Sequence, residues 1–196
     1  MMIKYLTEIR QAMESSINVK QLILNDKAFL ERIDKAVSTC VEALQKGGKI
    51  WFAGNGGSAA DAQHLAAELS GRFYLDRTPV PAEALHVNSS FLTAVANDYG
   101  YDQVYARLLK GCAHPGDVLF AISTSGDSDN IVKAVLMANS MNVNVIGMTG
   151  ATGGIIKDHC DVLLNVPSKD TPRIQECHIM IGHIICENIE KELFGS

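Results

Sequence analysis

The residues from Gly54 to Arg72 join two features that can do chemistry: a glycine turn and a helical pattern that carries an imidazole and a carboxylate. The stretch reads GNGGSAADAQHLAAELSGR. His64 and Glu68 are four residues apart, so on a helix they share a face, with their Cβ atoms about 5–6 Å from each other. Small and apolar residues surround them, which argues against a merely solvated polar face. The pair can supply a general base and acid, or two ligands for a metal ion.

A second set of polar side chains with helical spacing lies near the C-terminus, in RIQECHIMIGHIICENI. Gln175 and His183 fall on roughly one face of the helix that this stretch predicts. His178 lies well round that helix, and we interpret it as a core histidine. Imidazole and carboxylate groups suit zinc, so His64, Glu68, Gln175 and His183 form a candidate metal set if the two helices meet. We expect Glu68 and His183 to converge on one pocket, with the other two lining it.

The glycine turn has the composition of an anion- or sugar-binding loop. Gly54, Gly56 and Gly57 permit close approach of backbone N–H groups to a ligand. Ser58 is expected to cap the helix, whose positive end then faces the loop. The turn also fits the dinucleotide pattern G-x-G-x-x-A, but Asn88 stands where that pattern requires an acidic residue. We therefore expect no nucleotide cofactor.

A serine-rich loop, ISTSGDSDN, follows another apolar run and opens another helical pattern. Its hydroxyl groups, its backbone N–H groups and the helix N-terminus can together hold a phosphate. The hydroxyl residues are Ser123, Thr124, Ser125 and Ser128. One such loop alone would be interpreted as an ordinary capped turn, but two at equivalent strand ends favour a ligand site.

Alternating strands and helices are expected to position these motifs. Short apolar runs predict strands at 49–54, 81–87, 117–123, 143–150 and 161–166. Helical patterns cover 58–71, 89–97, 101–111, 128–141, 153–158 and 172–194. This order is typical of a doubly wound, five-stranded parallel sheet flanked by helices, which binds ligands at the carboxyl ends of its strands.

We expect a single domain over residues 1–196, of which 1–46 form an N-terminal helical arm. Apolar residues recur at helical spacing from 3 to 46, as one long helix or two consecutive ones. The arm has more apolar surface than one sheet needs. We therefore expect it to cover the sheet in part and to form an oligomer interface in part.

The composition of the chain limits the kinds of binding partner and the cellular compartment that we expect. With 196 residues, 47% of them hydrophobic, the chain can bury a sizeable core, and its net charge of −5 disfavours nucleic acid and anionic membranes as partners. It lacks the apolar run of about 18 residues that a membrane span needs, and its N-terminus lacks the pattern of a signal peptide. The five cysteines are scattered, with no C-x-x-C pair. They are expected to be reduced thiols in a cytoplasmic protein.

Taken together, GNGGSAADAQH, ISTSGDS and TPRIQECHIMIGHII resemble the SIS (sugar isomerase) domain family, and specifically its phosphoheptose isomerases. The resemblance covers nearly the whole chain, and the pairing of Glu68 with His183 is its most specific part. It implies a homotetramer with active sites at subunit interfaces. It also implies interconversion of D-sedoheptulose 7-phosphate and D-glycero-D-manno-heptose 7-phosphate through an enediol. That reaction begins nucleotide-activated heptose biosynthesis for lipopolysaccharide or surface-layer glycans.

The same resemblance implies roles for individual residues. Glu68 and His183 match the catalytic acid/base pair. The implied zinc ligands are His64, Glu68, Gln175 and His183, and the implied phosphate loop is Ser123, Thr124, Ser125 and Ser128. The implied substrate contacts at the sugar are Asn55, Gly56, Gly57, Ser58, Asn97, Asp98 and Gln175. One departure is NSSFLTAV, at 88–95, which replaces the Thr-Asp-rich segment expected there.

A non-catalytic scaffold is the alternative. Replication-initiator-associating proteins resemble this family throughout but lack the acid at the Glu68 position and the histidine at the His183 position. This sequence has both, which favours the enzyme. A sugar-phosphate-sensing regulator is disfavoured because the sequence shows no DNA-binding segment.

Overall fold

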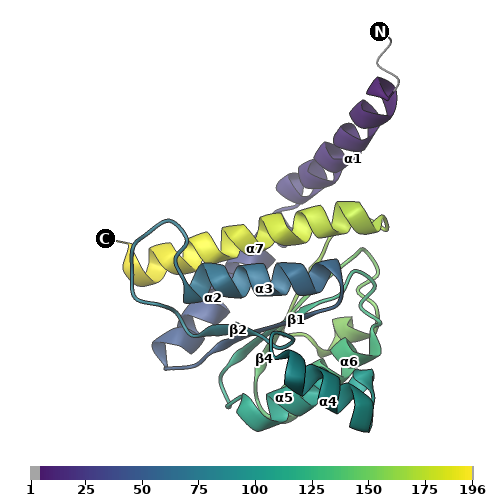
Figure 1. Ribbon diagram of the computed structural model, residues 1–196. Helices are drawn as coiled ribbons and strands as arrows, with labels where there is room; N and C mark the ends of the chain where they lie inside the picture. Colours follow the sequence, from purple (N-terminus) through teal and green to yellow (C-terminus); the bar gives the residue numbers. More distant parts are fainter. Residues whose placement is uncertain (1–4, 196) are drawn as a thin grey trace.

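A five-stranded parallel sheet lies between two layers of helices in the computed structural model, which describes residues 5–195 (Figure 1). The strands are β1 (Ile50–Gly54), β2 (Ala82–Ala84), β3 (Val118–Ile122), β4 (Asn144–Thr149) and β5 (Val162–Asn165). Their order is β2-β1-β3-β4-β5, and each neighbouring pair is parallel. The expected fold class is confirmed.

This strand order creates a switch point between β1 and β3. From β1 the chain steps outward to β2, and from β3 it steps the other way to β4 and β5. Ligands of doubly wound sheets bind at the carboxyl ends of the strands beside such a point. The glycine turn follows β1 and the serine loop follows β3, so both candidate loops flank it.

The helices divide between the two faces of the sheet. One layer contains α1 (Leu6–Asn25), α2 (Lys27–Gln45), α3 (Gly57–Ser70) and α7 (Thr171–Phe194). The other contains α4 (Ser89–Tyr99), α5 (Val104–Cys112), α6 (Asp129–Ser140) and the 3₁₀ helix η2 (Ile155–His159), while the 3₁₀ helix η1 (Tyr101–Gln103) joins α4 to α5.

Strand β1 shows why the sequence reads as apolar runs. Ile50 and Phe52 face the α3 and α7 layer, whereas Trp51 and Ala53 face the α5 and α6 layer. Because successive side chains of a strand point to opposite faces, a strand covered on both sides is apolar throughout. The Phe52 ring stacks on that of Phe120 in β3, with centroids 4.9 Å apart.

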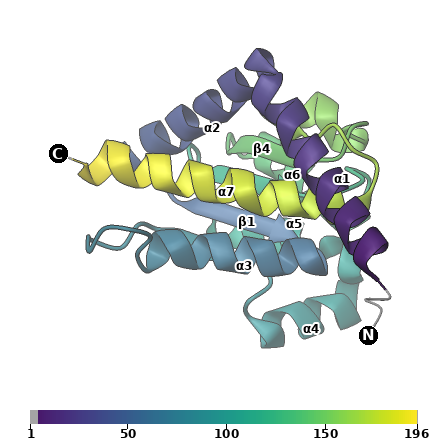
Figure 2. The same cartoon turned by 90° about the horizontal axis from the view of Figure 1, so that it is seen from above.

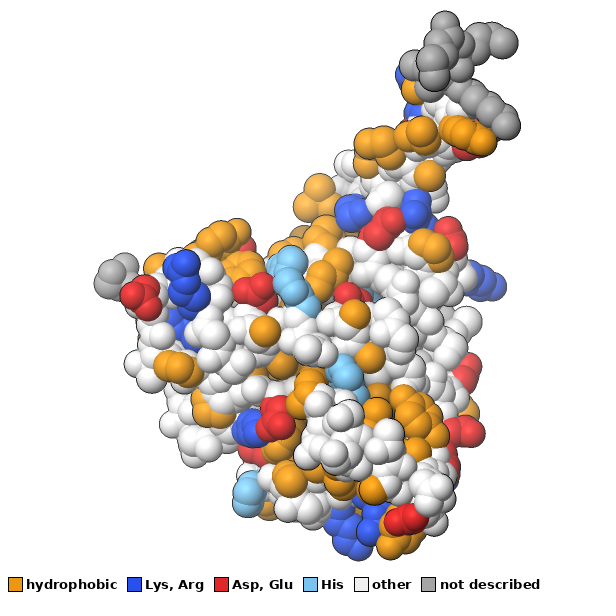
Figure 3. Space-filling view, in the orientation of Figure 1, with side chains coloured by type: hydrophobic (Ala, Val, Ile, Leu, Met, Phe, Trp, Pro, Cys, Tyr) orange, Lys and Arg blue, Asp and Glu red, His pale blue; other side chains and the backbone are white. Residues whose placement is uncertain are grey.

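The N-terminal arm is two helices. The first ends at Asp26, whose backbone N–H donates to the Ile23 carbonyl. The Asp26 carboxylate caps the second by accepting a hydrogen bond from the Phe29 N–H at 3.1 Å. Helix α1 projects from the body (Figure 1), and within it Val19 and Ile23 are buried. Figure 3 shows hydrophobic side chains at the surface along this helix. The exposed apolar residues of α1 are Leu6, Ile9, Met13, Ile17, Leu22 and Leu24. The interface role of the arm stays a prediction, and residues 1–4 lie outside the described part.

Two local expectations differ from the structure. Strand β2 spans three residues rather than 81–87. Pro81 has no N–H to extend the ladder, and the Val87 N–H bonds back to the Ala84 carbonyl in a turn. Ser58 is not the cap of α3: Gly56, with φ of +54°, holds that position, and the helix begins at Gly57.

Candidate active site

Helices α3 and α7 run side by side over β1 (Figure 2). They pack tightly at Gly182, where an added Cβ would lie 2.5 Å from the Leu65 Cδ1 atom. A side chain at this position would force the buried Leu65 side chain or the helices themselves to shift. The sequence neighbours of these two packing residues, His64 and His183, are thereby brought face to face.

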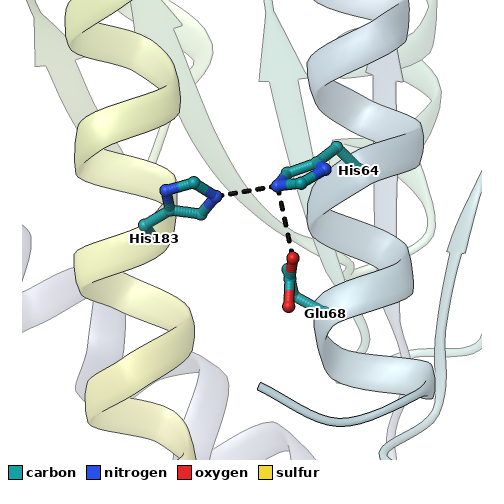
Figure 4. A group of neighbouring side chains, drawn as sticks. All are labelled: His64, Glu68 and His183. Carbon is teal, nitrogen blue, oxygen red and sulfur yellow. Dashed lines mark hydrogen bonds and ion pairs between the residues drawn. The ribbon is translucent and has the colours of Figure 1, made fainter. Parts of the chain in front are cut away.

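Three side chains from the two helices point toward one another (Figure 4). The Nε2 atoms of His64 and His183 are 2.8 Å apart, and the His64 Nε2 atom is 3.3 Å from Oε1 of Glu68. Glu68 and His183 therefore lie close together, with their nearest ligand atoms within 4.8 Å, and their role as a catalytic pair stays a prediction. The His64 side chain is 49% exposed and that of Glu68 is 22% exposed, so in a single chain the cluster opens to solvent. The arrangement offers a carboxylate and an imidazole to one bound molecule.

The same cluster fits a metal ion. The candidate ligand atoms of His64, Glu68 and His183 all lie within 4.8 Å of one another. Zinc binds imidazole nitrogen and carboxylate oxygen at about 2.0–2.2 Å, so small side-chain movements would place all three around one ion. Gln175, the fourth expected ligand, packs on the glycine turn: its Nε2 atom lies 2.5 Å from where a Cβ on Gly57 would stand. Its role as a ligand stays a prediction.

Two further residues belong to this surface. The Asp61 carboxyl lies near both imidazoles: burial raises its pKa, and His64 and His183 partly offset that rise. The Phe73 ring lies 5.7 Å from the His183 ring, centroid to centroid. Asp61 could have been found from its spacing of three and seven residues to His64 and Glu68. Phe73 comes from the irregular segment after α3, where no periodicity marks it.

The glycine turn is shaped by close backbone contacts. An added Cβ on Gly54 would lie 2.3 Å from the Ser58 carbonyl oxygen, so only glycine allows the chain to fold back here. The Ser58 N–H donates to the Asn55 carbonyl at 3.0 Å. Ser58 lies in the first turn of α3 and is itself buried.

Asn55 is held by residues that the sequence did not reveal. Its amide and that of Asn130 exchange two hydrogen bonds, both of 2.8 Å. The hydroxyls of Tyr101 and Tyr105 donate to the Asn55 Oδ1 atom at 3.4 Å, and Tyr105 also donates to the Gly54 carbonyl at 2.5 Å. These partners come from later elements, and no local pattern links them to the turn. Together they fix the orientation of the Asn55 amide.

The serine loop gathers hydroxyl groups at the N-terminus of α6. The Ser123 Oγ atom lies 3.5 Å from that of Ser125 and 3.3 Å from that of Ser128, and it accepts from the Gly126 N–H at 3.1 Å. Ser128 is the N-cap residue of α6 but makes no side-chain capping bond, so its hydroxyl turns to the cluster instead. Thr124 and Ser125 line a cavity of about 200 Å³ beside the start of α7.

Asn97 and Asp98 are the expected sugar contacts that remain to be placed. Asn97 and Asp98 lie in the exposed last turn of α4, where the Asn97 amide donates to the Asp98 carboxylate at 2.9 Å. Within the described chain, no hydrogen bond joins them to the other candidate residues, and their role stays a prediction.

His178 is the core histidine that we expected: it is fully buried, its Nε2 atom is 3.1 Å from the Thr149 carbonyl oxygen, and burial lowers its pKa to about 4.

The class of the protein follows from this fold and from similarity to known proteins. The family model "SIS domain" matches residues 15–150. The chain is 50% identical over 186 residues to a phosphoheptose isomerase of Aneurinibacillus thermoaerophilus, covering 95% of this chain and 94% of the relative. It is 52% identical over 180 residues to one of Mycobacterium bovis, covering 92% of each.

Solved structures agree. A phosphoheptose isomerase from Neisseria gonorrhoeae superposes with a TM-score of 0.89 at 41% identity, covering 94% of this chain and 98% of that one. One from Francisella tularensis superposes with a TM-score of 0.92 at 37% identity, covering 96% and 100%. The chain therefore belongs to the SIS domain family and, within it, to the phosphoheptose isomerases.

Proposed function

We propose that this protein is an aldose–ketose isomerase that converts D-sedoheptulose 7-phosphate into D-glycero-D-manno-heptose 7-phosphate. This reaction would begin nucleotide-activated heptose biosynthesis for lipopolysaccharide or other surface glycans. The observation that carries the proposal is the meeting of Glu68 and His183, which come from the two neighbouring helices α3 and α7. The names of relatives at about half identity support the same reaction.

The chemistry requires one proton to move between neighbouring carbons and another between neighbouring oxygens. In the proposed mechanism the Glu68 carboxylate removes a proton from C1 of the ketose and returns it to C2. His183 donates a proton to the C2 oxygen as the enediol forms, and accepts the proton of the C1 hydroxyl as the aldehyde forms. Each acid–base contact of this kind contributes about 10²–10⁴-fold to a rate.

The two loops would bind the non-reacting parts of the sugar. The cluster of Ser123, Ser125 and Ser128 hydroxyls, together with Thr124 and the N-terminus of α6, suits a phosphate without any cationic side chain. The glycine turn suits the hydroxyl groups of the open-chain sugar. The residues that we assign to those contacts are Asn55, Gly56, Gly57, Ser58, Asn97, Asp98 and Gln175.

Zinc is the cofactor that we propose, held by His64, Glu68 and His183 with Gln175 as a fourth ligand. The three clustered ligand atoms support it. When bound, such an ion would polarise the carbonyl and stabilise negative charge on the enediolate. We propose no nucleotide cofactor.

We further propose a cytoplasmic homotetramer. The exposed apolar side chains along α1 support assembly, because surfaces of this kind mark interfaces. The half-exposed His64 supports an active site that a second subunit closes. Within the described residues all five cysteines are unpaired, in keeping with a reducing compartment, and no helix there is long and apolar enough to cross a membrane.

The scaffold alternative is weaker because it gives no role to the converging Glu68 and His183. A turnover assay separates the two. Purified protein is incubated with sedoheptulose 7-phosphate, and the aldose product is identified by NMR. The isomerase produces the manno-configured aldose 7-phosphate; an assembled, folded protein that leaves the ketose unchanged would support the scaffold.

A further inference from the structure

A buried ion pair joins the segment after α3 to the last turns of α7. Its acid, Glu190, follows His183 by seven residues along α7. The Arg77 Nε atom is 3.0 Å from Oε1 of Glu190, and their side chains are 3% and 2% exposed. Each partner uses its remaining hydrogen-bonding capacity on backbone groups. A pair with so many fixed partners defines the relative positions of the segments that it joins.

Arg77 holds the C-terminal end of α3. Its Nη2 group donates to the carbonyl of Glu68 at 2.9 Å, and its Nη1 group donates to those of Leu69 at 2.7 Å and Gly71 at 3.1 Å. The last carbonyls of a helix lack partners within the helix, and the guanidinium supplies them here. One of these contacts is therefore to the backbone of the proposed catalytic base itself.

Glu190 holds the segment that packs against His183. Its carboxylate accepts hydrogen bonds from the N–H groups of Phe73 at 3.2 Å, Tyr74 at 2.8 Å and Leu75 at 2.9 Å. Burial alone would raise the pKa of the Glu190 carboxyl, but these three bonds and the one from Arg77 keep that pKa below its usual value. Glu190 follows His183 by seven residues, so both lie on one face of α7, and the Phe73 ring reaches the His183 ring.

A role in stability alone explains this arrangement poorly. Burying an ion pair removes two charges from water, and an apolar pair of similar size is often at least as stable. What an ion pair adds is fixed geometry, because each of its bonds has a preferred direction. In this chain the bonds of the pair fix the backbone of Glu68 and the backbone of Phe73, whose ring lies beside that of His183.

We propose that Arg77 and Glu190 are positioning residues, which hold the Glu68 end of α3 and the Phe73 segment on α7 so that Glu68 and His183 keep the separation that isomerisation needs. The inference rests on the proposed function, because it takes Glu68 and His183 as the reacting groups. Neither Arg77 nor Glu190 touches the substrate in this account. Their loss should slow the chemical step and leave phosphate binding intact.

The test compares Glu190→Gln with the matched control Glu187→Gln, which lies on the same helix. Glu187 pairs with Lys191 at 2.6 Å in an exposed i,i+4 contact that involves none of the site. Glutamine in place of Glu190 keeps the shape but offers one acceptor oxygen for four donors. Misplacement by about 1 Å can cost about 10²-fold in rate, so we expect kcat to fall about 10–100-fold in Glu190→Gln.

KM for sedoheptulose 7-phosphate should stay within about 2-fold of the wild-type value, because the serine loop contacts neither residue of the pair. Glu187→Gln should match the wild type in both constants. All variants are assayed where circular dichroism shows them fully folded. If folded Glu190→Gln keeps the wild-type kcat, the positioning role is wrong; if its KM rises with kcat unchanged, the pair serves binding and the proposal is also wrong.

Arg77→Lys is the second variant, for the case in which Glu190→Gln does not fold. It keeps the charge but cannot reach three carbonyls at once, so the same loss of kcat is expected, and a wild-type kcat would overturn the proposal. If the wild-type protein shows no turnover, the proposed function fails separately. Hydrogen exchange then tests whether the ion pair holds the segment after α3. The amides of 71–75 should exchange at least about 10-fold faster in Glu190→Gln than in Glu187→Gln. Equal exchange would overturn the positioning role.

Discussion

His178 should make the stability of the fold fall sharply in mild acid. This imidazole is fully buried between α7 and the sheet, where its Nε2 group donates to the Thr149 carbonyl at 3.1 Å. A proton on the remaining ring nitrogen would place a charge in the core, since within the described structure the His178 Nδ1 atom has no hydrogen-bond partner. The folded protein therefore keeps this ring neutral.

The size of the effect follows from the two pKa values. Burial lowers the pKa of His178 from 6.5 to about 4 in the folded state. Between these values the unfolded chain binds a proton that the folded chain does not, so stability rises with pH across that window. A difference of about 2.5 in pKa corresponds to about 3 kcal/mol, which is fully present above pH 6.5 and lost as the pH falls to about 4.

The assay compares the wild type with His178→Gln by urea unfolding at pH 4.5 and pH 7.5. Glutamine keeps a donor for the Thr149 carbonyl but does not titrate. Other carboxyl groups contribute equally to both proteins, so the wild type should lose about 2–3 kcal/mol more than the variant between the two pH values. If both proteins lose the same amount, the buried neutral histidine is not the cause and the reasoning fails.

Three further predictions concern binding, assembly and helix packing. Ser125→Ala should raise KM for the sugar phosphate about 10-fold or more, with a smaller effect on kcat, because its hydroxyl is assigned to a non-reacting group; steady-state kinetics that change kcat alone would contradict this. Replacing Ile9 and Ile17 by aspartate should convert the assembly into smaller species in light scattering, whereas an unchanged mass would exclude α1 from the interface. Gly182→Ala should cost about 1–3 kcal/mol in urea unfolding, because the new Cβ would lie 2.5 Å from a buried Leu65 atom; an unaffected stability would show that the packing of Gly182 against Leu65 does not constrain α3 and α7.

The fold could be predicted because its strands are covered on both faces. A strand such as Ile50–Gly54 is buried at every position, so it appears in the sequence as an apolar run that ends in glycine. The edge strand β2 was predicted too long, because its apolar residues continue into a turn. Pro81 bounds the strand at its start, and a hydrogen bond between Ala84 and Val87 turns the chain at its end; neither feature alters hydrophobic periodicity.

The site could be predicted only as far as single helices allow. The spacing of His64 and Glu68 indicates one shared face, the spacing of Gln175 and His183 indicates another, and the family resemblance pairs Glu68 with His183. The two helices meet where Gly182 packs against Leu65. A glycine within an apolar helical pattern does not predict such a contact. The pairing of Arg77 with Glu190 joins residues 113 positions apart, and an acid near a helix end resembles an ordinary solvated residue. Contacts of this kind exist only once the tertiary structure has formed.

Glu68→Gln, followed by isomerisation in D₂O, tests the central claim most directly. In the wild type the Glu68 carboxyl exchanges the abstracted proton with solvent, so product and recovered ketose should gain deuterium at the reacting carbons. Glutamine preserves the shape of the side chain but is not a base, so turnover and deuterium incorporation should fall together by about 10²–10⁴-fold while the protein stays folded and assembled. Near wild-type turnover, or continued incorporation of deuterium, in folded Glu68→Gln would show that the base is another residue.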